Sequence, residues 1–207
     1  MKIAVINEVS ASHRNAEILA ALEGSSHTVH NIGMKNPDQK PELTYIHTGL
    51  MAAILLNSKA VDFVIGGCGT GQGFLNSAVQ YPGVFCGLIV DPLEGWLFTQ
   101  INGGNCISLP LNKGYGWAGD VNLKFIFEKL FACEIGAGYP EHRKESQRNS
   151  RELLRNISKN AHKSMDEILN NMDREIIDRL SEAEEFCRLL KECGDGGEDY
   201  LKKLKEY

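Results

Sequence analysis

The chain has 207 residues, of which 43% are hydrophobic and 24% are charged. This length and balance predict a folded protein with one main domain, and they exclude a disordered or fibrous chain. The net charge of -5 and the pI near 5.7 argue against the basic surface that nucleic-acid binding requires.

The hydrophobic pattern indicates neither a secretory signal nor a membrane helix. The opening residues MKIAVINEVS hold an apolar run too short for a signal peptide, and no segment approaches roughly 18 consecutive apolar residues. We therefore expect a cytoplasmic protein. The six cysteines form no CxxC pair and have no histidines at ligand spacing, so we expect reduced thiols and no metal.

The first 150 residues alternate between short apolar runs and segments with helical spacing. The apolar runs are typical of buried strands, and the longer segments are typical of amphipathic helices. Strands are expected at 2–7, 27–32, 62–66, 84–90 and 105–109, a turn at 10–12, and helices from there to 24 and at 43–59, 92–101 and 120–134. This alternation predicts parallel βαβ units and therefore an α/β fold.

The composition changes beyond residue 150. Strand-forming runs stop, and from Met165 to Leu180 apolar residues recur every three or four positions among many charges. The pattern predicts a helical extension of one or two segments over residues 151–207, with a late turn at 195–197. We expect its apolar stripe to pack against the main domain, residues 1–150, or against a sister subunit. A recruited partner is the alternative.

The stretch IGGCGTGQGF, residues 65–74, places a cysteine and a threonine among glycines. A glycine-rich turn from a strand into a helix lies at the carboxyl edge of a parallel sheet, where ligands of α/β proteins bind. The spacing argues against three known kinds of phosphate-binding loop. No lysine follows the glycines as in a Walker loop, and the GxGxxG fingerprint of dinucleotide-binding proteins is absent. Phe74 stands where a cysteine phosphatase loop needs arginine. A tight turn around an inert buried cysteine is the structural alternative.

The same stretch suits proton transfer beside a carbonyl group. A strand end close to successive peptide N–H groups and a helix N-terminus stabilises a thiolate, and a thiolate is a general base. We expect Cys68 to move the proton. The amides of Gly69, Thr70 and Gly71, with the Thr70 hydroxyl, would then hold the oxyanion that forms on the substrate.

Several motifs, in this order along the chain, resemble the ribose-5-phosphate isomerase B and galactose-6-phosphate isomerase family of sugar-phosphate isomerases. They are Lys2-Ile3-Ala4, Tyr45-Ile46-His47, Cys68-Gly69-Thr70-Gly71-Gln72-Gly73, Pro82-Gly83-Val84, Asp91-Pro92, and Asn102 with Asn105. The resemblance covers roughly residues 1–150. It implies a three-layer αβα sandwich with a five-stranded parallel, Rossmann-like sheet. It also implies a homodimer or homotetramer with active sites between subunits, and aldose–ketose interconversion through a cis-enediolate without metal or organic cofactor.

The resemblance also assigns roles to residues. It makes Cys68 the base that moves a proton between C1 and C2, and it makes Thr70 and the loop amides the groups that steady the enediolate. The expected substrate-binding residues are Glu8, Tyr45, His47, Gly69, Gly71, Gly73 and Asn102. The expected phosphate-binding residues are His13, Lys113, His142, Arg143 and Arg148, and the late basic cluster is expected to reach the neighbouring subunit's site.

Two departures from the family bear on the substrate. Glu8-Val9 stands where the family carries Asp-His, so a carboxylate is kept and a substrate-binding histidine is lost. Ile101 replaces the histidine that assists opening of the cyclic sugar, and isoleucine cannot transfer a proton. We therefore expect an open-chain substrate, such as a four-carbon sugar phosphate that lacks the hydroxyl needed for ring closure. Pentose and hexose phosphates remain alternatives.

Two other functions are compatible with the sequence. A catalytically weak partner subunit, or a regulator that binds sugar phosphates, would explain the absence of two family histidines. A flavodoxin-like redox module fits the expected sheet, but a mononucleotide loop is normally richer in Ser and Thr donors than GCGTGQG.

Overall fold

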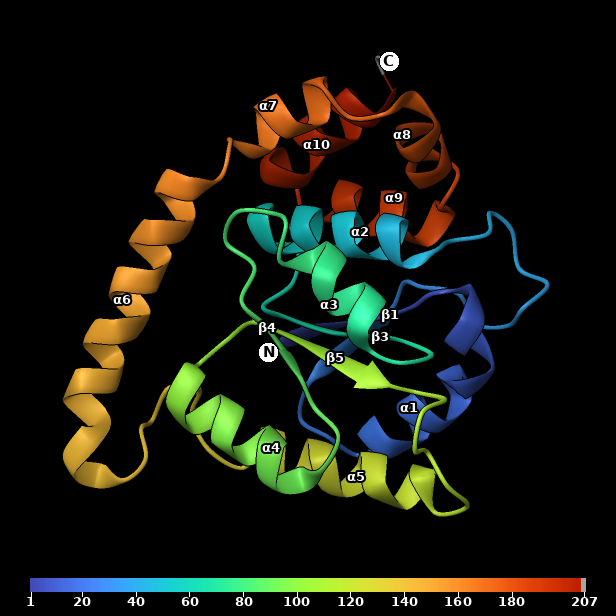
Figure 1. Cartoon of the computed structure of the whole chain (residues 1–207). Helices are drawn as coiled ribbons and strands as arrows, with labels where there is room; N and C mark the ends of the chain where they lie inside the picture. The colour runs from blue at the N-terminus through green and yellow to red at the C-terminus, as the bar shows by residue number, and fades with distance from the viewer. Residues whose placement is uncertain (206–207) are drawn as a thin grey trace.

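The computed structural model describes residues 1–205, apart from the side chain of Asp195, so residues 206 and 207 of the expected extension lie outside the described part. Five parallel strands form one sheet in the order β2-β1-β3-β5-β4 (Figure 1). The strands are β1 Lys2–Asn7, β2 Thr28–Asn31, β3 Phe63–Cys68, β4 Cys86–Leu88 and β5 Cys106–Pro110. The alternating pattern of the sequence therefore predicted the fold class correctly.

Helices cover both faces of the sheet (Figure 1). Alternate residues of the strands face opposite sides, so Ala4 and Ile6 join one core and Ile3 and Val5 the other. The helices over the first core are α2 Tyr45–Asn57 and α3 Gln72–Ala78; those over the second are α1 Asn15–Leu22, α4 Pro92–Leu97 and α5 Gly119–Leu130. This arrangement is the three-layer αβα sandwich that was expected.

Two of the connecting segments are short helices of other kinds. A 3-10 helix, η1 Val9–Arg14, follows β1 directly and leads into α1. The segment expected as one helix over 92–101 instead divides into α4 and a π-helical turn, η2 Phe98–Asn102, which ends at Gly103 with a φ of 55°. The left-handed conformation of Gly103 stops the helix before β5.

The extension contains more helices than the sequence pattern suggested. Its helices are α6 Lys144–Ala161, which follows the 3-10 helix η3 Glu141–Arg143, then α7 Met165–Asn170, α8 Arg174–Ser181, α9 Glu184–Glu192 and α10 Asp195–Lys205. The expectation of one or two segments was wrong because Ser164 and Asp173 cap new helices, accepting the N–H groups of Glu167 and Glu175. The turn expected at 195–197 is the start of α10.

Helices α7 to α10 form an additional layer on the outer side of α2 (Figure 1). Ile177, Leu180, Phe186 and Leu190 are at most 1% exposed and share one core with the buried side chains of α2. The apolar stripe of the extension therefore packs against the main domain.

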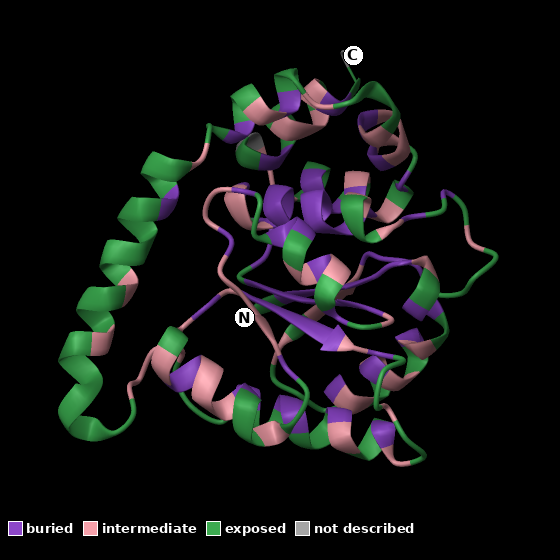
Figure 2. Ribbon diagram, in the orientation of Figure 1, coloured by how far each residue is buried: buried purple, intermediate pink, exposed green. Residues whose placement is uncertain are grey.

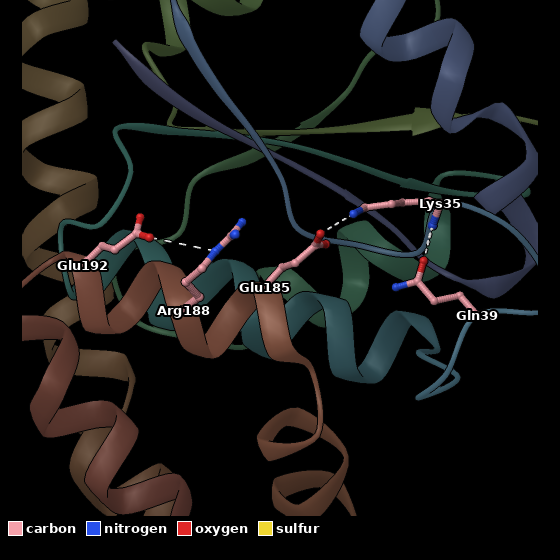
Figure 3. A network of polar contacts seen from close by, with 5 residues as sticks. All are labelled: Lys35, Gln39, Glu185, Arg188 and Glu192. Atoms are coloured by element: carbon pink, nitrogen blue, oxygen red, sulfur yellow. Dashed lines mark hydrogen bonds and ion pairs between the residues drawn. The ribbon is translucent and has the colours of Figure 1, made fainter.

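Polar contacts also join this outer layer to the segment that leads into α2. Lys35 Nζ forms an ion pair with Glu185 of α9, and the Lys35 N–H donates to Gln39 Oε1 at 2.8 Å (Figure 3). A further pair, Arg188 with Glu192 at 3.9 Å, runs along α9 itself. The outer layer thus holds the chain just before α2.

Helix α6 is different, because it runs along the side of the molecule and most of its surface is exposed (Figure 2). Leu153, Leu154 and Ile157 lie on one side of α6 and are 63%, 51% and 59% exposed. Within the described residues this apolar face of α6 is left uncovered. None of the described helices is both long enough and apolar enough to cross a membrane.

Candidate active site

The glycine loop follows β3 at the carboxyl edge of the sheet. Cys68 is the last residue of β3, and Gln72 begins α3. In the register of the sheet, Gly67 pairs with Asn7 of β1 and Cys68 pairs with Pro110 of β5. The loop therefore lies between the ends of β1 and β5, at the edge where open α/β sheets bind ligands.

Cys68 lies at the border between the core and the exposed part of the loop. Its side chain is on the α2 side of the sheet, and the residue is 6% exposed. Its Sγ lies 4.0 Å from Thr70 Oγ1, and Thr70 is exposed. The structure thus places the thiol next to the hydroxyl that the sequence analysis assigned to the same site.

The loop amides are not equally available to a ligand. The Gly69 N–H donates to Ser10 Oγ at 3.1 Å, and the Gly71 N–H donates to the Cys68 carbonyl at 3.3 Å. The Thr70 hydroxyl accepts the N–H of Gln72 at 3.3 Å. Of the three amides expected to hold the oxyanion, only the Thr70 N–H has no partner among the described residues, so it is the one of the three that is open to an oxyanion in this conformation.

Backbone geometry and close packing explain two of the glycines. Gly71 is the N-cap of α3 and has a φ of 76°, a left-handed conformation that favours glycine. Gly73 packs against Tyr45, since a Cβ at Gly73 would lie 2.9 Å from Cδ1 of that ring. Tyr45 therefore borders the glycine loop, where the sequence analysis expected a residue that lines the substrate.

Three loops are hydrogen-bonded together around Cys68. Ser10, just after β1, donates its hydroxyl to Glu8 Oε1 and accepts the Gly69 N–H. Asn112, just after β5, donates its side-chain amide to the Ser10 carbonyl at 2.9 Å and its N–H to the Gly69 carbonyl at 3.0 Å. Glu8 is 4% exposed, so its carboxylate lies inside this arrangement rather than in solvent.

His47 takes a capping role in this chain. Its Nδ1 accepts the N–H of Thr44 at 3.0 Å, which completes a capping box at the start of α2. Burial lowers the pKa of His47 first, Arg179 of α8 lowers it further, and Glu175 and Glu42 oppose the shift. The neutral imidazole is therefore favoured at neutral pH, with Nδ1 as an acceptor. Substrate binding by His47 remains a prediction.

The expected phosphate ligands are spread over the molecule. The Lys113 N–H donates to the Gly69 carbonyl at 2.9 Å, so Lys113 lies beside the loop, and His13 is exposed on the nearby η1. His142 and Arg143 are in η3, and Arg148 is in α6, on the side of the molecule away from the carboxyl end of β5 (Figure 1). One chain alone does not bring this second group to Cys68.

Asn102 and Ile101 also lie away from the thiol. Both are in η2 and line a cavity of about 420 Å³ together with Arg151 and Leu154 of α6. This turn comes just before the amino end of β5, whereas Cys68 pairs with Pro110 at its carboxyl end. Within a single chain, Asn102 and Cys68 are at opposite edges of the sheet.

Comparison with known proteins identifies the family. The sequence model described as Ribose/Galactose Isomerase matches residues 3–143, which is most of the chain. The chain belongs to the ribose/galactose isomerase family. Two solved structures of isomerases match along the whole chain as well, so the chain is an aldose–ketose isomerase.

These two full-length structures share the fold of this family member, including its C-terminal helices. A ribose-5-phosphate isomerase from Vibrio parahaemolyticus is 42% identical, with 99% of each chain covered and a TM-score of 0.93. A 4-deoxy-L-threo-5-hexosulose-uronate ketol-isomerase in complex with a tartrate is 37% identical, with 100% of each chain covered and a TM-score of 0.93. No curated protein sequence matches the chain.

A more distant family structure shares only the main fold. The type B ribose 5-phosphate isomerase of Trypanosoma cruzi is 17% identical, with a TM-score of 0.64, and 77% of this isomerase and 99% of that chain are covered. The two full-length matches therefore contain an extension that this shorter structure does not match.

Sequence reasoning placed the Asn112-Lys113 turn near the phosphate, but it missed that Ser10 and Asn112 hold the glycine loop. Each follows the carboxyl end of a strand that flanks β3, and this position was the available signal. Their contacts with the loop depend on the folded paths of two other connections, which no motif within the loop specifies.

Proposed function

We propose that the protein interconverts the aldose and ketose forms of an open-chain acidic sugar, with Cys68 as the base. The single observation that carries this proposal is the position of the Cys68 thiol, 4.0 Å from the Thr70 hydroxyl and beside the unpartnered Thr70 N–H. A base next to preorganised hydrogen-bond donors is the arrangement that enolisation of a sugar requires.

In the proposed reaction, the Cys68 thiolate removes the proton from the carbon beside the carbonyl group. The electrons of that C–H bond form a double bond between the two carbons, and the carbonyl oxygen becomes an oxyanion that the Thr70 N–H stabilises. The thiol then returns the proton to the former carbonyl carbon. One hydroxyl proton moves between the two substrate oxygens, so atoms and charge balance.

If a second copy of the chain brings η2 to the site, Ile101 arrives with Asn102, and its side chain has no group that transfers a proton. This favours a substrate that needs no ring opening. A 4-deoxy-5-hexosulose uronate is such a compound: it has no hydroxyl at C4 and a ketone at C5, so neither position closes a furanose or pyranose ring on C1. The full-length similarity to a ketol-isomerase named for this uronate supports the same choice. The substrate we propose is therefore an open-chain sugar with a terminal carboxylate.

A second copy of the chain is the proposed source of the rest of the site. Asn102, Arg143 and Arg148 do not reach Cys68 within one chain, as the register and Figure 1 indicate. The uncovered apolar face of α6, formed by Leu153, Leu154 and Ile157, supports a homodimer, since exposed apolar patches of this kind mark protein interfaces. In such a dimer, the basic residues near α6 would face the partner's loop.

A substrate screen tests this proposal. The purified protein is assayed by NMR with 4-deoxy-L-threo-5-hexosulose uronate, erythrose 4-phosphate, ribose 5-phosphate and galactose 6-phosphate. We expect kcat/KM for the uronate to exceed that for ribose 5-phosphate by at least about 100-fold, a difference of about 3 kcal/mol. Turnover of ribose 5-phosphate faster than that of the uronate would overturn the open-chain proposal. Faster turnover of erythrose 4-phosphate would show that the acidic group of the substrate is a phosphate rather than a carboxylate.

The same assay decides between an active enzyme and a catalytically weak partner subunit. Absence of turnover with all four sugars, together with binding of one of them in a thermal shift assay, would favour the partner subunit or regulator. We expect turnover by this chain alone.

A further inference from the structure

Ser10 connects the buried carboxylate of the site to the loop that carries the thiol. Its hydroxyl donates to Glu8 Oε1 and accepts the Gly69 N–H at 3.1 Å. Its carbonyl accepts the side-chain amide of Asn112 at 2.9 Å. We infer that Ser10 is a positioning residue, which holds the peptide after Cys68 so that the thiol is correctly placed for proton transfer. This inference rests on the proposed role of Cys68 as the base.

The direction of these hydrogen bonds follows from the groups involved. The Gly69 N–H can only donate, so the single hydroxyl proton of Ser10 is directed toward Glu8 Oε1. A lone pair of Ser10 Oγ is then left to accept the Gly69 N–H. The chain of donors runs from Gly69 through Ser10 to Glu8, and the buried position of Glu8 fixes its far end.

The peptide between Cys68 and Gly69 is held at both of its polar atoms. Its N–H is bound by Ser10, and its carbonyl oxygen accepts N–H groups from Leu111 at 3.0 Å and Gly71 at 3.3 Å. Because this peptide is attached to the Cα of Cys68, its orientation fixes the backbone from which the thiol projects. Ser10, on the β1 side of the loop, binds the N–H of this peptide, whereas Leu111, on the β5 side, binds only its carbonyl oxygen.

Ser12 provides a matched control. It belongs to the same 3-10 helix, it is buried, and its hydroxyl donates to the Val9 carbonyl at 3.0 Å, within that helix. Loss of the Ser12 hydroxyl disturbs η1 without touching the glycine loop. A general loosening of η1 is thus distinguishable from loss of the Ser10 link.

The first test measures kinetics with 4-deoxy-L-threo-5-hexosulose uronate. We expect Ser10→Ala to lower kcat by about 10-fold with KM within about 3-fold of the wild type, because misplacement of a base affects the transition state more than binding. Ser10→Thr keeps the hydroxyl and is expected to restore kcat to within about 3-fold. Ser12→Ala is expected to leave kcat within about 2-fold.

The second test needs no substrate. Alkylation of each cysteine by iodoacetamide is followed by peptide mass spectrometry, with the fully buried Cys106 as the internal control. We expect Ser10→Ala to raise the alkylation rate of Cys68 at least about 5-fold, since the released loop opens more often, and to leave Cys106 unchanged. Ser10→Thr and Ser12→Ala are expected to match the wild type.

The outcomes separate the two proposals. Wild-type kcat and wild-type Cys68 alkylation in Ser10→Ala would overturn the positioning role, as would an equal rise at Cys106 or an equal effect of Ser12→Ala. If Cys68→Ser retains turnover, the role of Cys68 as base fails, and the alkylation experiment still decides whether Ser10 orders the loop.

Discussion

The ring of Tyr45 packs against the backbone of Gly73, so that a Cβ at Gly73 would lie 2.9 Å from Cδ1 and 3.0 Å from Cγ of the ring. Tyr45 is the first residue of α2, and Gly73 is the second residue of α3. The contact therefore joins the start of α2 to the end of the loop that carries Cys68. Tyr45 is 43% exposed, so part of this residue is available to a ligand.

Gly73→Ala tests whether this contact matters for turnover. The added methyl group must displace the ring or the loop by a few tenths of an ångström, and we expect kcat/KM to fall about 10-fold. In a Tyr45→Ala background the ring is absent, so the same substitution should cost less than about 2-fold. The double-mutant cycle is measured by steady-state kinetics, and equal effects in the two backgrounds would refute the coupling.

The capping role of His47 predicts a pH dependence of stability. The pKa of His47 is lowered by burial and by Arg179, so the unfolded chain binds more protons than the folded chain below the usual histidine value, about 6.5. The contribution of His47 is therefore fully present above that value and is lost as the pH falls through the lower folded-state pKa. Protonation also removes the Nδ1 acceptor that caps Thr44.

His47→Gln isolates this effect, because glutamine suits the third position of a capping box and does not titrate. We expect the fall in the free energy of unfolding between about pH 7.5 and about pH 5 to be smaller in the variant. Urea unfolding at several pH values measures it. Some slope should remain from His27, whose pKa is lowered by burial and by the N-terminal ammonium. An unchanged slope in His47→Gln would contradict the assignment.

Adjacent residues of α9 should differ sharply in their effect on stability. Phe186 is 0% exposed in the core shared with α2, so Phe186→Ala is expected to destabilise the protein by about 3–5 kcal/mol. Glu185→Gln removes the ion pair between Glu185 and Lys35. Because both side chains are partly exposed, we expect this change to lower the free energy of unfolding by less than about 1 kcal/mol. Urea unfolding compares the two, and a larger effect of Glu185→Gln would show that polar contacts anchor this layer.

The apolar face of α6 predicts the oligomeric state. We expect sedimentation velocity to show a dimer for the wild type and a monomer for the double variant Leu154→Glu, Ile157→Glu, because charges on that face would have to be desolvated in the interface. Turnover should fall when the dimer is lost, since the proposed site uses residues of both copies. Asn156→Glu, an exposed residue on another side of α6, is the control. A dimer that survives the double variant would exclude this interface.

Much of the fold follows from local sequence patterns. The strands of the sheet are apolar runs that helices cover on both faces, and such runs stand out in the sequence of a parallel sheet. The position of Cys68 at the end of β3 follows from the same reasoning, because a strand, a glycine-rich turn and a helix come in sequence.

The remaining features depend on contacts between distant segments. The Gly69 amide, expected to bind the substrate oxyanion, is instead bonded to Ser10, which lies 59 positions earlier. The number of helices in the extension was underestimated because caps such as Ser164 interrupt a helical pattern that otherwise continues. Asn102 lies at the opposite edge of the sheet from Cys68, a separation that only the register of β3 and β5 reveals.

The most direct test of the account is proton transfer by Cys68, followed by NMR in deuterated water with 4-deoxy-L-threo-5-hexosulose uronate. We expect Cys68→Ser to fold normally, to lose at least about 100-fold in turnover and to stop incorporating deuterium beside the carbonyl group. Cys133→Ser, which changes an exposed thiol, should behave as the wild type. Turnover and deuterium incorporation by Cys68→Ser within about 3-fold of the wild type would contradict the central claim.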